Sequence, residues 1–262
     1  MSAKYDSIGR TYTRTRRADP RIVAAILELL GPDANSVVEI GAGTGNYSRE
    51  LAQAGKRVLA IEPSRVMIDQ ADSHPNLRWM QSTVEDLAPD LEQFDAALCM
   101  LSFHHFQDKE LAVRNIFRLL KPGGKLLMFS ADPRLTPDDC WMKNYFEPLY
   151  DLDCENLPAL SRLRDLLKEV FQADVSVRKF MLPDDLKDQF FYANWKYPER
   201  YLDEEVRRGS SVFSLLPDTH IDQLLGKLEA DLTSGAWDRT YGRVRDLSEY
   251  DGGYFFVATA RN

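Results

Sequence analysis

Residues 37–45 read V-V-E-I-G-A-G-T-G, an apolar run that ends in three glycines spaced two apart. The apolar run predicts a buried strand. The glycines predict a tight loop, because glycine reaches positive φ angles without steric cost. Ligands of open α/β sheets bind where such a loop leaves the carboxyl end of a strand and leads into a helix. This stretch therefore predicts both the fold class and the position of a binding site.

The chain around this stretch alternates between the strand pattern and the helix pattern. Apolar residues at helical spacing predict helices at 20–30, 47–54, 65–73 and 109–120. Apolar runs between turn residues predict strands at 37–40, 57–61, 77–80, 96–100 and 125–129. Such alternation indicates right-handed βαβ units, so we expect an α/β protein with a mostly parallel sheet and helices on both faces.

The pattern changes after residue 130. Residues 134–172 read as mostly helical, and two further strands are expected at 175–180 and 254–260. The segment between these two strands is rich in Phe, Tyr and Trp, which predicts a helical insertion over the edge of the sheet that carries the loop. Its aromatic side chains form either an ordinary helical core or the walls of a lid, because ligand pockets favour aromatic walls.

Composition narrows the class of protein. With 262 residues, 44% of them hydrophobic, the chain is long enough for one large α/β domain with an insertion. A net charge of −8 disfavours nucleic acid as the main partner, because an acidic protein repels a phosphate backbone. The cysteines show no zinc spacing, and no apolar run reaches the ~20 residues of a membrane span. We expect a cytoplasmic monomer or homodimer without a metal or a membrane contact.

One basic segment departs from this acidic balance. Its arginines are Arg10, Arg14, Arg16, Arg17 and Arg21, with only Asp19 between them as an opposing charge. The segment is either a solvated basic arm or an anion-binding lip beside the site.

The glycine loop itself departs from the dinucleotide fingerprint. In the fingerprint G-x-G-x-x-G the third glycine falls one residue later than it does here. Glu39 ends the strand, and its carboxylate would repel a pyrophosphate and attract a cationic group such as an ammonium. Glu62 ends the next strand, where a carboxylate can accept hydrogen bonds from both hydroxyls of a ribose. Together the two carboxylates predict a ligand with a ribose and a positively charged amino-acid end.

Four motifs, in order, resemble those of a known family. They are E-I-G-A-G-T-G at 39–45, I-E-P-S-R-V-M at 61–67, F-D-A-A-L-C-M-L-S-F-H-H-F at 94–106 and L-K-P-G-G-K-L at 120–126. The chain thereby resembles the class I S-adenosylmethionine-dependent methyltransferases of the type 11 group. Its segment Y-D-S-I-G-R-T-Y at 5–12 resembles the arm that closes over the cofactor in small-molecule members.

The resemblance implies a fold and a division of the chain. The fold is a Rossmann-like, seven-stranded, mostly parallel sheet with strand order 3-2-1-4-5-7-6 and a helical insertion before the last strand. The expected parts are an N-terminal helical arm at 1–32, a cofactor-binding core at 33–180, an aromatic-rich helical cap at 181–250 and the final core strand at 251–262.

The resemblance also implies a methyl donor, S-adenosyl-L-methionine, with S-adenosyl-L-homocysteine as the product. Glu39 and the loop would hold the methionine end, Glu62 the ribose and Met67 the adenine. Thr83 stands where an aspartate commonly accepts from the adenine amine, and its hydroxyl can also accept there. The implied cofactor-binding residues are Tyr12, Glu39, Gly41, Ala42, Gly43, Gly45, Glu62, Pro63, Met67, Thr83, Val84, Glu85 and Met100.

The acceptor is expected to be a small molecule. Methyl transfer displaces a leaving group that is already activated, so alignment and desolvation can supply much of the rate. If the acceptor must lose a proton, His104 is the expected general base. Alternatively, of His104 and His105, one packs on the cofactor and the other caps the next helix. The residues expected to bind the acceptor are Arg17, His105, Trp141 and Tyr145, with the arginines of the arm reading a carboxylate or phosphate on it.

Other functions stay open at this point. The alternatives are methylation of tRNA or protein, a binding or regulatory protein of this fold without turnover, and a nicotinamide dehydrogenase. No Asn-Pro-Pro-Tyr-like tetrad follows the fourth strand, which argues against methylation of amino groups on DNA bases and protein glutamine. The acidic charge argues against RNA, and the scattered cysteines give little support for an arsenite methyltransferase. A small-molecule methyltransferase is therefore the main hypothesis.

Overall fold

The computed structural model describes residues 16–262, so the expected roles of Tyr12 and of segment 5–12 lie outside the described part. Its centre is a seven-stranded sheet in the order β3-β2-β1-β4-β5-β9-β6. The strands are β1 Ser36–Ile40, β2 Arg57–Ile61, β3 Leu77–Met80, β4 Phe94–Met100, β5 Leu120–Ala131, β6 Ser176–Lys179 and β9 Tyr254–Ala260. Strand β9 runs opposite to the other six strands of this sheet, which are parallel to one another. This confirms the expected fold class and strand order, since β9 is the seventh strand of the sheet along the chain.

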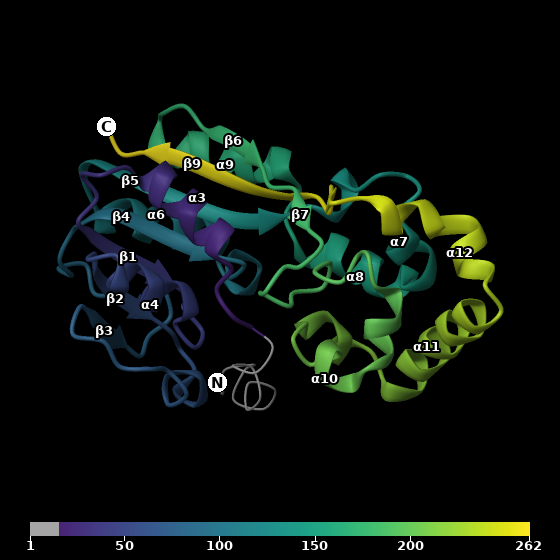
Figure 1. Ribbon diagram of the computed structural model, residues 1–262. Helices are drawn as coiled ribbons and strands as arrows, with labels where there is room; N and C mark the ends of the chain where they lie inside the picture. Colours follow the sequence, from purple (N-terminus) through teal and green to yellow (C-terminus); the bar gives the residue numbers. More distant parts are fainter. Residues whose placement is uncertain (1–15) are drawn as a thin grey trace.

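Helices cover both faces of the sheet (Figure 1). The helices α3 Pro20–Leu30 and α4 Asn46–Gln53 pack on one face, and α6 Lys109–Leu119 and α9 Leu160–Phe171 pack on the other. Successive side chains of a strand point to opposite faces, so Val37 joins the first hydrophobic cluster and Val38 joins the second. Every residue of β1 is buried, as expected for a parallel strand at the centre of a sheet covered on both sides.

Two elements differ from the expected length by five residues or more. Helix α5 spans only Arg65–Ile68 and not 65–73, because the polar residues D-S-H-P at 72–75 favour a turn and offer no apolar face to bury. Strand β5 runs through the expected turn at 121–124. It does so with a shift of register opposite β4 and with Gly123 at a φ of +77°.

A helical cap lies beside the carboxyl edge of the sheet (Figure 1). We use this name for α7, α8 and residues 181–250. Its helices are α7 Trp141–Tyr145, α8 Glu147–Asn156, α10 Glu204–Arg207, α11 Asp218–Thr233 and α12 Ala236–Tyr241. Short 3-10 turns at Pro198–Leu202, Ser211–Leu215 and Gly242–Asp246 and a two-stranded ladder of β7 Leu182–Pro183 and β8 Glu249–Tyr250 complete it. Helix α7 contacts α11, so the cap draws on two separate segments of the chain, one of which we had expected in the core.

The aromatic side chains deep in the cap form a packed core. Trp141, Trp195 and Trp237 are each less than 2% exposed. The indole N–H of Trp141 donates to the carbonyl of Trp195 at 2.7 Å, and its ring meets that of Trp237 edge-on at 5.6 Å. For these residues the ordinary-core interpretation of the insertion is correct.

This packing predicts the effect of Trp141→Phe on stability. We expect the free energy of unfolding to fall by about 2–4 kcal/mol, because the substitution leaves a void and takes the donor from a buried carbonyl. Urea denaturation followed by circular dichroism measures the change. Leu247→Ala is the control within the cap, because Leu247 is 42% exposed and its truncation should cost under ~0.5 kcal/mol. Equal stability of the two variants would contradict the assignment of Trp141 to the core.

Candidate cofactor site

A cavity lies at the carboxyl edge of the sheet, where β1, β2 and β4 end. Its volume is about 470 Å³, in the range of small-molecule sites. The predicted site residues that line it are Glu39, Gly41, Ala42, Gly43, Glu62, Pro63, Met67, Thr83, Val84, Glu85, Met100 and His105. The fold therefore brings most of the predicted cofactor-binding residues together around one space.

The glycines of the loop are required by its shape. Gly41, Gly43 and Gly45 have φ angles of +68°, +59° and +75°. A Cβ added to Gly41 would lie 2.6 Å from Cβ of Ser102, and one added to Gly45 would lie 2.6 Å from the ring of Trp79. Gly45 is the residue before the first residue of α4 and is not among the residues that line the cavity, so its role in cofactor binding stays a prediction.

The carboxylate of Glu62 links the end of β2 to this loop. It accepts hydrogen bonds from the backbone N–H of Gly43 and from that of Ser64, both at 2.9 Å. Glu62 is buried yet lines the cavity, so its carboxylate is held at the position where a ribose would be bound in this fold.

Glu39 ends β1 in a nearly water-free position. Burial raises the pKa of its carboxyl to about 7, and the hydrogen bonds from the Ser48 hydroxyl and backbone oppose that rise. Glu39 also lines the cavity. A cation bound beside it would favour the charged carboxylate and lower the pKa again.

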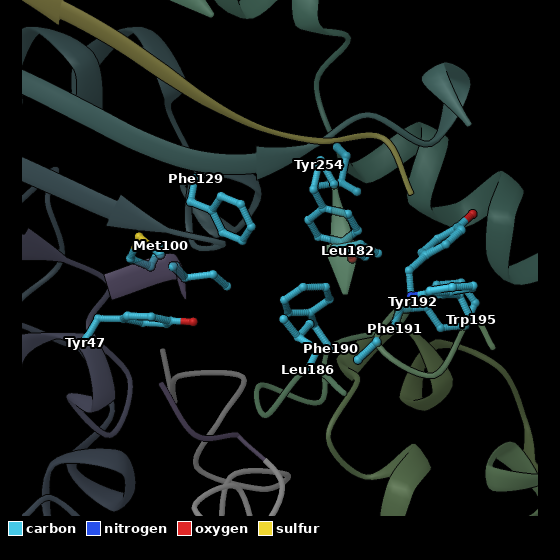
Figure 2. Close-up of a cluster of buried hydrophobic side chains, with 14 of the residues drawn as sticks. Tyr47, Met100, Phe129, Leu182, Leu186, Phe190, Phe191, Tyr192, Trp195 and Tyr254 are labelled. Carbon is cyan, nitrogen blue, oxygen red and sulfur yellow. The ribbon is translucent and has the colours of Figure 1, made fainter. Parts of the chain in front are cut away.

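Groups that the sequence analysis did not select close one end of the cavity. Asp188, from the cap, forms an ion pair with Arg16 and accepts a hydrogen bond from the Tyr47 hydroxyl at 2.9 Å. The side-chain amide of Asn46 donates to the carbonyl of Arg16 at 2.6 Å. Figure 2 shows Tyr47 extending from the sheet side toward Phe190 of the cap. All of these except Phe190 line the cavity.

Of the two adjacent histidines, the second lies at the cavity. His105 lines the cavity, whereas His104 is not among the described residues of its wall. The two rings pack against each other with centroids 3.8 Å apart in the 3-10 turn Phe103–His105. The turn therefore brings the second histidine to the described wall of the cavity and not the first, and the role of either one as a base stays a prediction.

The wall beyond Glu62 is fixed by local hydrogen bonds. The Thr83 hydroxyl donates to the carboxylate of Asp86 at 2.7 Å and accepts from the backbone N–H of Asp86 at 3.2 Å. One lone pair of its oxygen remains for a further donor. Glu85 accepts from the backbone N–H of Gln107 at 2.9 Å and so joins this wall to the turn after β4.

Three residues expected at the acceptor lie outside the described wall. Trp141 is buried in the cap core, and the Tyr145 hydroxyl donates to Asp231 of α11 at 2.7 Å. Arg17 is exposed, while its neighbour Arg16 reaches the cavity. Residues 16–19 form no helix or strand, so no regular pattern in the sequence could separate the two arginines.

The chain is similar to known proteins. Residues 38–128 match a family model described as a methyltransferase domain. A solved structure from Anabaena variabilis ATCC 29413, assigned as a methyltransferase of an antibiotic biosynthesis pathway, is 39% identical. The match covers 94% of this chain and 98% of that chain, with a TM-score of 0.88. The chain belongs to the S-adenosylmethionine-dependent methyltransferases.

Other relatives of this methyltransferase match less completely. The ubiquinone biosynthesis O-methyltransferase of Pseudomonas fluorescens is 32% identical over 114 residues, 41% of this chain and 49% of that protein. The chain thus spans about half the length of the curated relatives it matches. Phosphoethanolamine N-methyltransferase 2 of Haemonchus contortus, in complex with phosphomonomethylethanolamine and S-adenosylhomocysteine, shares the fold at 16% identity and a TM-score of 0.60. That match covers 98% of this chain and 57% of that chain.

The cavity of this methyltransferase fits S-adenosyl-L-methionine by the chemistry of its walls. Glu62 offers a carboxylate for a ribose, and Glu39 offers a second carboxylate for a cationic group. The missing side chain of Gly41 leaves a cradle that a Cβ would obstruct. Within residues 16–262 no helix is long and apolar enough to cross a membrane, and no group of three or more His, Cys, Asp or Glu residues could hold a metal ion.

The close contact at Gly41 predicts the effect of Gly41→Ala. The substitution adds a clash with Ser102 to the strain of a positive φ, so we expect loss of more than ~2 kcal/mol of unfolding free energy and at least tenfold weaker binding of S-adenosylhomocysteine. Calorimetry and urea denaturation measure the two effects. Gly55→Ala is the matched control: its φ is +86°, but nothing lies within 4 Å of an added Cβ. If both variants bind equally well, the close approach at Gly41 is irrelevant to the ligand.

The raised pKa of Glu39 predicts pH-dependent binding. A cationic ligand prefers the charged carboxylate, which predominates only above pH ~7, so affinity should rise from pH 5.5 to 8 and then level off. Below that pKa the loss should approach tenfold per pH unit. Titration of S-adenosylhomocysteine in buffers of different ionisation enthalpy measures both affinity and proton release. Glu39→Gln should bind more weakly and lose this pH dependence; an unchanged profile would exclude Glu39 as its source.

Proposed function

We propose that this methyltransferase transfers a methyl group from S-adenosyl-L-methionine to a small-molecule acceptor and releases S-adenosyl-L-homocysteine. The observation that carries the proposal is the row of groups along one cavity. Glu62, which would bind the ribose, lies at the end of β2, the glycine loop is beside it, and Glu39 and Met100 lie at the ends of β1 and β4. A ligand with a ribose and a cationic amino-acid end matches this row, and a pyrophosphate does not.

The bound donor would supply a methyl group already activated on a sulfonium. The protein then has to align the acceptor and exclude water. Two hydrogen bonds fix the turn after β4. The backbone N–H of Leu101 donates to the carbonyl of Phe129 at 2.9 Å, and the Ser102 hydroxyl donates to the carbonyl of Ile40 at 2.7 Å. These bonds hold Leu101 at a positive φ of 49°, a strained conformation of the kind that is concentrated at functional sites.

The position of the cap favours a small molecule as the methyl acceptor. It lies beside the carboxyl edge of the sheet and contributes Asp188 to the cavity wall, so protein from outside the sheet also bounds the site. Recognition of tRNA or another macromolecule is favoured by an open and basic surface, whereas the net charge here is −8. Arg16 in the wall is consistent with an anionic group on a ligand.

Incubation with labelled donor tests this function. Donor labelled in its methyl group is mixed with a small-molecule metabolite extract and, separately, with tRNA and with protein fractions. A labelled small product supports the proposal. Label in a macromolecular fraction supports the alternative of tRNA or protein methylation, and tight binding of donor without any product supports a binding protein without turnover.

His105 is the candidate general base for an acceptor that must lose a proton. With such an acceptor we expect His105→Asn to lower kcat at least tenfold and to remove the acid limb of the pH profile, while the affinity for S-adenosylhomocysteine stays within about threefold. His104→Asn, one residue earlier and outside the described wall, serves as the comparison. If kcat falls further in the His104 variant than in the His105 variant, His104 is the base, as expected from the sequence.

A further inference from the structure

Helix α4 follows the glycine loop, and its first turn needs hydrogen-bond acceptors from elsewhere in the fold. The residue before it is Gly45, which has no side chain to cap the helix. N–H groups in the first turn of a helix lack partners within the helix and carry a partial positive charge. Ser48, the third residue of α4, is 0% exposed, so the protein and not water has to supply partners for its N–H and its hydroxyl.

The carboxylate of Glu39 is the partner of both groups. It accepts one hydrogen bond from the hydroxyl of Ser48 and one from its backbone N–H. Glu39 is 1% exposed, so both bonds lie out of contact with water. Hydrogen bonds to a charged group are about twice as strong as bonds between neutral groups, and a low local dielectric strengthens them further. The start of α4 therefore fixes this carboxylate at the place where Glu39 lines the cavity.

The other surroundings of Glu39 disfavour its charge. Burial is the largest cause of its raised pKa, and the carboxylate of Glu62 after β2 raises that pKa further. On the other neighbour of β1, strand β4, the ionisable group near Glu39 is Cys99. Burial and Glu39 both raise the pKa of the Cys99 thiol, so it adds no charge at neutral pH. Within residues 16–262, the hydrogen bonds that favour the charged form of Glu39 both come from Ser48.

A cationic ligand needs a carboxylate that is charged and correctly directed, and Ser48 acts on both properties. Two donors from one residue restrict the rotation of the carboxylate. Hydrogen bonds to the charged form also favour deprotonation, against the effects of burial and of Glu62. Ser48 itself is not among the described residues of the cavity wall, so its effect on a ligand passes through Glu39.

We propose that Ser48 is a positioning residue of the donor site, which directs the Glu39 carboxylate toward the cationic group of the donor and favours its charged form. The start of α4 thereby sets the lower limit of the pH range in which the donor binds tightly. This inference rests on the proposed function, because it takes S-adenosylmethionine as the donor. It deepens that function by assigning the pH range of donor binding to a serine outside the described cavity wall.

Ser48→Ala tests this role through the pH dependence of binding. Loss of the hydroxyl should raise the pH at which affinity levels off by about one pH unit, because a hydrogen bond to a charged group is removed. We expect S-adenosylhomocysteine to bind the variant about tenfold more weakly than the wild type at pH 6.5. At pH 8.5, where Glu39 is charged in both proteins, the affinities should agree within about threefold. Calorimetry at the two pH values measures them, and an equal loss at both, or no loss, would overturn the inference.

A double variant shows whether Ser48 acts through Glu39. Glu39→Gln removes the charge that Ser48 favours, so adding Ser48→Ala to it should change the affinity for S-adenosylhomocysteine by no more than about twofold at pH 6.5. If Ser48 affected the cavity by another route, the two substitutions would weaken binding additively. That outcome would overturn the inference and leave the proposed function standing. Absence of S-adenosylhomocysteine binding by the wild type would remove the proposed function itself.

Two further variants separate the hydroxyl from general packing. Ser48→Thr keeps a hydroxyl and should keep the wild-type difference in affinity between pH 6.5 and 8.5. Ser36→Ala is the matched control, because Ser36 is a buried serine at the other end of β1 whose hydroxyl donates to the carboxylate of Asp95 at 2.8 Å. Its affinity for S-adenosylhomocysteine should stay within about twofold of the wild type at both pH values. A Ser36 variant with the same pH-dependent loss would show that any loosening of β1 has this effect, and would overturn the role of Ser48.

Discussion

Two backbone N–H groups, from Gly43 and Ser64, converge on the carboxylate of Glu62 at 2.9 Å each. This small network joins the end of β2 to the loop that follows β1, and it does so inside the protein, where an unpaired carboxylate would be costly. The loop can reach Glu62 only through left-handed backbone conformations, which is why its glycines alternate with other residues. Residues from β4, the N-terminal arm and the cap complete the wall of the cavity around the Glu62 carboxylate.

The sheet and the position of the site could be predicted from the sequence because both depend on local patterns. The apolar run at 37–40 and the spacing from the glycine loop to Glu62 are readable within about 25 residues of chain. Side-chain direction in irregular segments is not encoded in this way. A 3-10 turn decides that His105 and not His104 reaches the cavity, and the irregular backbone before α3 decides between Arg16 and Arg17. No local sequence pattern marks Asp188 as a site residue, because only the tertiary fold brings it to Tyr47.

The cap and one face of the sheet share a single hydrophobic cluster. Figure 2 shows Phe129 of β5 and Tyr254 of β9 on the sheet side, with Phe190 and Leu186 of the cap opposite them. Phe190 stacks on Tyr254 at 4.4 Å, and Phe129 lies 5.8 Å from the same ring. A side chain altered in this cluster therefore changes the packing of the cap and the end of the sheet at once.

The place of β9 in the sheet has a consequence for how the protein folds. Its residues pair with β5 across a wide separation in sequence, as Lys125 with Ala260, and they also pair with β6, so the sheet is complete only when this strand docks. Such non-local pairings must overcome loop-closure entropy before they contribute contacts, which slows folding. Tyr254 is both part of this strand and a wall of the shared cluster. The cap core therefore gains its final packing in the same slow step that closes the sheet, and the two parts are expected to form a single kinetic unit.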